Sequence, residues 1–121
     1  MASIITLTTH SDDNGDLTVV DFFDFNVKRF FYITAVPQNM IRGLHGHIKN
    51  RMALIALSGS VDIFYNNGSE SNTITLNSKN ICLQLEPNDW HRLENFSSDI
   101  ILLVACSEPY DKNDYFFEEP A

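Results

Sequence analysis

Residues 42 to 51 read RGLHGHIKNR and hold two of the chain's four histidines, His45 and His47. Alternate residues of a β-strand point to the same side, so the two imidazoles are expected to project into one space. Two neutral imidazoles side by side serve either as metal ligands or as a general acid and base. The segment therefore predicts a paired imidazole site on a strand and leaves both uses open.

Apolar runs of strand length recur on both sides of this segment, separated by turn residues such as Asn66-Asn67-Gly68. Val, Ile, Phe, Tyr and Thr dominate the runs, which is the composition of β-strands. The expected strands are residues 16–23, 28–36, 52–57, 61–65, 72–76, 81–85 and 100–105. Short strands spaced this closely predict an all-β sandwich or barrel. The length of 121 residues predicts a single domain covering 1–121.

Charge is distributed unevenly along the chain. The net charge of −8 argues against a nucleic-acid-binding protein, because a phosphate backbone is held mainly by positive charge. Five of the eight basic residues, and none of the 16 acidic residues, lie between Phe25 and Val61. This segment fits a small anionic ligand, and a solvated basic face is the equal alternative.

Other sequence features bear on location and on the ends of the chain. The first residues lack the basic start and apolar stretch of a secretory signal, and no apolar run is long enough to cross a membrane, so we expect a cytoplasmic protein. Cys82 and Cys106 lie in apolar runs and are expected to be buried free thiols. The acidic, aromatic tail from Glu108 to Ala121 is expected to pack on a barrel end or a partner subunit, with a frayed tail as the alternative.

A small barrel with a His-x-His strand is similar to the cupin pattern, in which a Glu and then a Gly follow the histidine pair. Met52 and Gly59 occupy those positions here, so the carboxylate ligand is lost. The second cupin element is present in a contracted version, as Pro87, His91 and Asn95. His45, His47 and His91 could then form a tris-imidazole site with an open position, as a catalytic metal requires. A metal-dependent cupin enzyme is therefore one alternative function.

A longer set of motifs covers about three quarters of the chain. In order, they are VKRFFY at 27–32, VP at 36–37, RG-x-H-x-H at 42–47, LSGSV at 57–61, Trp90, NFSS at 95–98, LLVA at 102–105 with Ser107, YD at 110–111 and DY at 114–115. This ordered set resembles the cupin-fold dTDP-4-keto-6-deoxyglucose 3,4-ketoisomerases of bacterial deoxyamino-sugar pathways, which precede an aminotransferase. The resemblance implies a small jelly-roll β-barrel of the cupin type and a homodimer.

The same resemblance implies an isomerase that moves a ketone from C4 to C3 of a dTDP-sugar through an enediol, with no metal and no redox cofactor. Histidine suits this shuttle because its ordinary pKa lies near neutral pH. His47 is expected to be the main acid and base and His45 its partner, an order that could be reversed. Tyr32 is expected to relay a proton or hold a sugar oxygen, with a core aromatic as the equal alternative.

A dTDP-sugar substrate, which the resemblance implies, needs side chains that bind its diphosphate and its thymine. Arg42 is expected to bind the diphosphate, because a guanidinium forks onto phosphate oxygens and keeps its charge, with Arg51 or Arg92 assisting. Trp90 or Phe31 is expected to stack on the thymine, and a core position is the equal alternative for Trp90. The expected partner is the dTDP-sugar, without nucleic acid or membrane, and the product would feed surface-glycan synthesis.

Two positions depart from the family pattern. The family has Lys and Gln where this chain has Ile48 and Met52. Lys49, one residue along, is expected to face the other side of the strand and so cannot replace the missing Lys. Turnover or sugar preference is expected to differ if those two side chains contact substrate. A non-catalytic sugar-nucleotide-binding domain is therefore the second alternative function.

Overall fold

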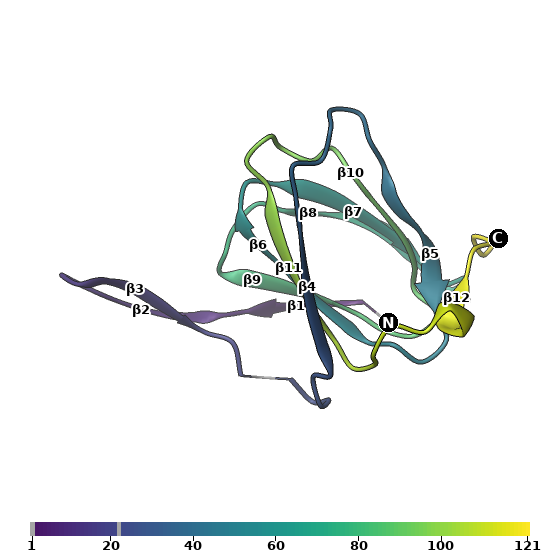
Figure 1. Cartoon of the computed structure of the whole chain (residues 1–121), viewed down its shortest axis with the longest axis horizontal. Coiled ribbons are helices and arrows are strands. Elements are labelled where there is room, and N and C mark those ends of the chain that lie inside the picture. The colour runs from purple at the N-terminus through teal and green to yellow at the C-terminus, as the bar shows by residue number, and fades with distance from the viewer. Residues whose placement is uncertain (1, 22) are drawn as a thin grey trace.

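Two five-stranded antiparallel sheets face each other in the computed structural model, which describes residues 2–21 and 23–121 (Figure 1). The first sheet consists, in spatial order, of β1 (Ser3–Thr6), β9 (Ile81–Leu85), β6 (Met52–Ser58), β11 (Ile101–Cys106) and β4 (Arg29–Thr34). The second consists of β12 (Tyr115–Phe116), β5 (Arg42–His47), β10 (Trp90–Glu94), β7 (Val61–Asn66) and β8 (Ser71–Leu76). The all-β barrel predicted from the sequence is confirmed.

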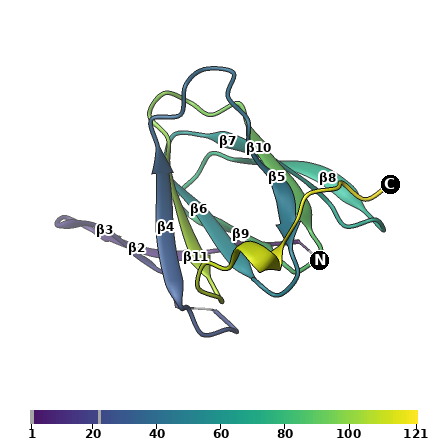
Figure 2. The same ribbon diagram turned by 45° about the vertical axis from the view of Figure 1, so that its right-hand side comes forward.

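Two smaller elements lie outside these sheets. The strands β2 (Thr8–Asp12) and β3 (Gly15–Val19) pair only with each other and form a ribbon that extends away from the barrel (Figures 1 and 2). A 3-10 turn, η1 (Lys112–Asp114), leads into β12 and lies beside β5. None of the described residues belongs to a helix that is long and apolar enough to span a membrane.

The core lies between the two sheets, and alternation along the strands fills it. On β7, Val61, Ile63 and Tyr65 are buried, and the residues between them are partly exposed. The first sheet also buries part of its outer face, where Ala53 and Ile55 belong to a second apolar cluster with the partly buried residues of the 23–27 segment. Burial on both faces explains why β6 reads as a continuous apolar run rather than as an alternating one.

Most of the predicted strands are confirmed within one or two residues at either end, and the two cysteines are buried and free. The strand predicted at 16–23 is shorter, because β3 ends at Val19, and Phe22 lies outside the described residues. The elements β1, β2, β10 and β12 were not among the predicted strands. Three of them are short or rich in Ser and Thr, and β10 carries charged residues that obscure its alternation.

Candidate active site

A cavity of about 290 Å³ lies between the two sheets. Six of the side chains that line it are apolar, namely Phe31, Ile33, Met52, Leu54, Leu93 and Val104. Polar side chains form the rest of its wall, namely Arg29, Arg42, His45, His47, His91 and Tyr115, with Gly43. None of the described Asp or Glu residues lines it, so this part of the interior suits an anion.

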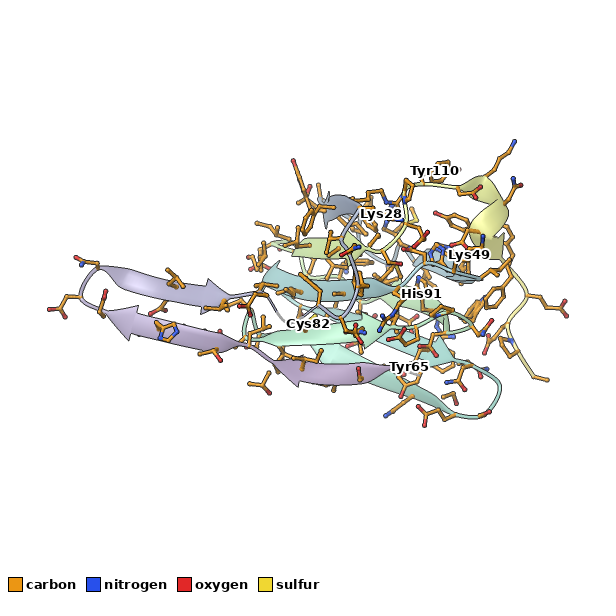
Figure 3. All side chains as sticks on the ribbon, turned by 90° about the horizontal axis from the view of Figure 1, so that it is seen from below. Lys28, Lys49, Tyr65, Cys82, His91 and Tyr110 are labelled. Carbon is orange, nitrogen blue, oxygen red and sulfur yellow. The ribbon has the colours of Figure 1, made fainter. Side chains whose placement is uncertain are left out.

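Three imidazoles share one wall of the cavity. His45 and His47 both face it from β5, as strand alternation predicted, and their ring centroids are 5.1 Å apart. His91 pairs with His45 across β5 and β10, and the centroids of these two rings are 4.8 Å apart. His91 lies in the body of the barrel, away from the protruding β2–β3 ribbon (Figure 3).

Each of these rings is held through its Nδ1 atom. His45 Nδ1 lies 2.9 Å from the carbonyl oxygen of Gly43, and His91 Nδ1 lies 3.2 Å from that of Asp89. His47 Nδ1 lies 3.2 Å from Oδ2 of the Asp114 carboxylate. Carbonyl and carboxylate oxygens only accept, so Nδ1 carries the proton in each neutral ring and Nε2 keeps its lone pair. The three rings therefore offer Nε2 as a base.

Burial lowers the pKa of all three histidines. The pKa of His47 falls to about 4, chiefly through burial and then through the nearby charge of His45, while Asp114 acts in the opposite direction. Burial likewise lowers the pKa of His45, and it lowers that of His91 to about 3. The rings are therefore neutral at neutral pH, and their lone pairs are available to accept protons.

A β-bulge in β5 brings Arg42 to the same side as the histidines. The register between β5 and β10 shifts at Leu44, which is the extra residue, and Gly43 and Leu44 adopt positive φ angles of 87° and 59°. By strict alternation Arg42 would face away from His45 and His47. The extra residue reverses that alternation, and Arg42 lines the cavity.

Comparisons with known proteins assign this chain to a family. The family model FdtA (WxcM-like, C-terminal) matches residues 1–120. The chain belongs to the FdtA family. A curated relative, the TDP-4-oxo-6-deoxy-alpha-D-glucose-3,4-oxoisomerase of Aneurinibacillus thermoaerophilus, is 34% identical over 107 residues, which make up 86% of this chain and 77% of the relative.

Solved structures of FdtA-like barrels agree with this assignment. QdtA, a sugar 3,4-ketoisomerase from Thermoanaerobacterium thermosaccharolyticum in complex with TDP, has a TM-score of 0.91 at 34% identity, covering 97% of this chain and 88% of its own. A histidine-to-asparagine mutant of QdtA, in complex with TDP-4-keto-6-deoxyglucose, has a TM-score of 0.91 at 33% identity, covering 97% and 87%. The epimerase RmlC of Legionella pneumophila shares the fold alone, with a TM-score of 0.81 at 13% identity, covering 96% and 71%. The cupin-type barrel predicted from the sequence is confirmed.

Two predicted binding residues of this FdtA-family chain reach the cavity, whereas Tyr32, which was predicted to act beside the histidines, does not. Phe31 and Arg42 both line it. Tyr32 follows Phe31 on β4 and therefore points to the opposite side, where 71% of it is exposed. The structure thus corrects both readings of Tyr32, because this side chain is neither beside the histidines nor in the core.

The side chains flanking His91 on β10 also point out of the cavity. Trp90 is buried outside the cavity and donates from Nε1 to the carbonyl oxygen of Phe117 at 3.1 Å. Its position agrees with the alternative prediction, which was a core residue. Arg92 stacks on Phe64, with Cζ 4.1 Å from the ring centroid, and pairs with Glu94. Neither is placed to contact a ligand in the cavity.

Arg51 is occupied by ion pairs and is likewise absent from the cavity wall. Its guanidinium binds Glu86 at 2.6 Å and Asp24 at 2.8 Å. Since the acid-free segment contributes only Arg29 and Arg42 to the cavity, the predicted basic pocket is smaller than the charge pattern indicated.

The two departures from the family pattern differ in their position. Ile48 is 54% exposed and does not line the cavity, whereas Met52 is buried and lines it. Lys49 lies in the turn after β5 rather than on the far side of the strand, because β5 ends at His47. Only the change at Met52 alters the chemistry of the cavity, where a thioether stands in place of an amide.

Sequence reasoning did not assign roles to Arg29, Tyr115 and Asp114. Tyr115 pairs with His47 across β12 and β5, and its ring centroid lies 4.6 Å from those of both His45 and His47. Arg29 lines the cavity, and its Nε is buried with no hydrogen-bond partner among the described residues. The aromatic tail was the available signal for Tyr115, and its predicted packing on the barrel is confirmed by β12.

The metal site of the cupin pattern lacks its carboxylate ligand here, because Met52 stands at that position. The part of the chain that the structure describes contains no group of three or more His, Cys, Asp or Glu side chains arranged to hold a metal ion. Met52, at the carboxylate position of that pattern, is a poor ligand for hard metals.

The bulge provides a first prediction, for Gly43→Ala. At φ 87° an alanine is strained, and its Cβ would lie 3.1 Å from both the His91 carbonyl oxygen and Leu93 Cδ1. We expect a stability loss of about 1–3 kcal/mol, measured by thermal denaturation, and a severalfold lower affinity for dTDP, measured by calorimetry. Gly68→Ala is the matched control, because Gly68 has φ 89° and only an ordinary contact with Pro120. Equal dTDP affinities in the two variants would contradict a role of the bulge in binding.

Proposed function

We propose that this protein is a dTDP-4-keto-6-deoxyglucose 3,4-ketoisomerase that works by histidine acid–base catalysis. The observation that carries the proposal is the pair of neutral rings, His45 and His47, which offer Nε2 inside a cavity that also contains Arg29 and Arg42. Membership of the FdtA family supports the substrate class, because the QdtA structures contain TDP or TDP-4-keto-6-deoxyglucose.

Moving the ketone shifts two protons, one between the carbons and one between the oxygens, and each ring carries one of them. His47 takes the proton from C3 at Nε2 and returns it to C4. His45 takes the proton of the C3 hydroxyl and delivers it to the C4 oxygen. The intermediate is the 3,4-enediolate, which keeps one proton between its two oxygens, and both rings end the cycle neutral, as they began it. A base that is already deprotonated at neutral pH suits the first step, because no proton has to leave the ring before catalysis.

The remaining wall suits the nucleotide. Arg42 is exposed at the cavity and supplies a forked, permanently charged donor for the diphosphate. Arg29 lies in the same wall with a free Nε for a phosphate or sugar oxygen. Phe31 offers its ring to the thymine from β4. Homodimer formation, cytoplasmic location, the single domain and the role in surface-glycan synthesis stay predictions from the sequence.

The test is to incubate the purified protein with dTDP-4-keto-6-deoxyglucose and follow the sugar by NMR. The C4 ketone should disappear as a C3 ketone forms. Persistence of the C4 ketone together with tight binding of the dTDP-sugar would instead identify a non-catalytic binding domain. Activity that is lost with a chelator and restored by a stoichiometric metal would favour the metal-dependent alternative.

A further inference from the structure

Asp114 is a buried carboxylate at the end of η1 and accepts hydrogen bonds from the turn that follows His47. It is 8% exposed. Oδ1 accepts from the backbone N–H of Lys49 at 2.7 Å, and Oδ2 accepts from that of Asn50 at 3.2 Å. The backbone carbonyl oxygen of Asp114 accepts from Ile48 N–H at 2.8 Å. The carboxylate therefore lies in a fixed position relative to the end of β5.

The same Oδ2 lies 3.2 Å from Nδ1 of His47. The partners of His45 and His91 at the equivalent atom are neutral backbone carbonyls. Among the three cavity rings, His47 is thus the one held by a charged acceptor. A carboxylate fixes the ring orientation, keeps the proton on Nδ1, and stabilises the imidazolium that forms when Nε2 takes a proton.

We infer that Asp114 is a positioning residue, which makes His47 rather than His45 or His91 the base that abstracts the carbon-bound proton. This inference rests on the proposed function. It adds a residue 67 positions along the chain from His47 to the catalytic arrangement. It also explains how a ring with a lowered pKa can still hold a proton during turnover, because the cation forms next to a fixed negative charge.

A purely structural role for Asp114 would be to stabilise the turn at residues 48–50. Asp114→Asn keeps the shorter of the two side-chain contacts with that turn and replaces the Oδ2 that faces both Asn50 N–H and His47 Nδ1. The asparagine oxygen can still accept from Lys49 N–H, which makes the shorter of the two backbone contacts. Its amide nitrogen then faces His47 as a donor. A donor at this position requires Nδ1 to accept, so the proton of the neutral ring moves to Nε2 and the lone pair is lost from the cavity.

The experiment is long-range ¹H–¹⁵N NMR of the histidine rings in the full chain, with the His47 signals assigned by their loss in His47→Asn. In the unmodified protein, His47 should carry its proton on Nδ1, and in Asp114→Asn it should carry it on Nε2. The kcat of Asp114→Asn should fall about tenfold or more with little change in KM, and Asp114→Glu should recover part of the loss. Asp111→Asn is the matched control, because it removes a carboxylate from the same turn that accepts from Asn113 N–H and does not touch His47.

A His47 proton on Nε2 in the unmodified protein would overturn the inference, and this measurement needs no variant to fold. An unchanged tautomer in Asp114→Asn, or an equal loss of kcat in Asp111→Asn, would overturn it in favour of turn stabilisation. If the unmodified protein converts no sugar, the proposed function fails by itself, and the tautomer measurement alone decides whether Asp114 sets the protonation of His47.

Discussion

Replacing His47 with asparagine is expected to lower the rate of ketone transfer by about 1,000-fold, in the range for loss of a general acid or base. An amide cannot take the C3 proton at neutral pH, although its nitrogen can still donate to Asp114. The arginines on the cavity wall are untouched, so the affinity for dTDP should change by less than about threefold. The rate is measured by NMR of the dTDP-sugar, and the affinity by calorimetric titration.

His91→Asn is the comparison for this prediction, because His91 belongs to the same wall but is held by a backbone carbonyl. If His91 transfers no proton, its loss should lower the rate by less than about tenfold. Comparable losses in both variants would contradict the division of roles and would favour a shared metal. Full activity of His47→Asn would remove His47 from the mechanism.

The fold was largely predictable because the apolar pattern of its central strands indicates which of their residues are buried. On β7 and β8 the alternation is visible, and the run from 52 to 57 is apolar because both faces of β6 are covered. The ribbon of β2 and β3 was not predictable in full, because it lies outside the two sheets and its residues need no apolar alternation to cover a core. Strand β10 was missed because His91 supplies one of its inward positions, and the outward ones hold a large aromatic residue and two charged residues, so polar and apolar residues do not alternate.

The site was predictable only where it is local. His45 and His47 share a face because they lie two residues apart, but nothing in the sequence says which face of β4 is inward, and Tyr32 was misplaced for that reason. Arg42 was expected in the site from the family resemblance, while the bulge that turns it inward has only Gly43 as its local signal. Asp114 reaches His47 through the two-residue pairing of β12 with β5, which no periodicity reveals.

Arg42→Ala is expected to raise the KM for the dTDP-sugar about 30-fold, which corresponds to about 2 kcal/mol for charge-assisted hydrogen bonds to a phosphate. The kcat should change by less than about threefold, because the diphosphate is bound equally in the ground state and the transition state. Arg42→Lys keeps the charge but loses the fork, so its KM should lie between the two. Steady-state kinetics at fixed ionic strength measure both parameters.

Arg92→Ala is the matched control, since Arg92 lies next to Gly43 in the pairing of β10 with β5 but faces outward. It loses the stacking on Phe64 and the pair with Glu94, at a cost of about 1 kcal/mol or less in stability. Because Arg92 does not line the cavity, the KM of Arg92→Ala for the dTDP-sugar should equal that of the unmodified protein. The two arginines come from paired strands and differ in the face they occupy, so the contrast isolates the effect of the bulge from that of net charge. An equal rise in KM for both variants would mean that the basic surface attracts the nucleotide from a distance rather than binding its diphosphate in the cavity.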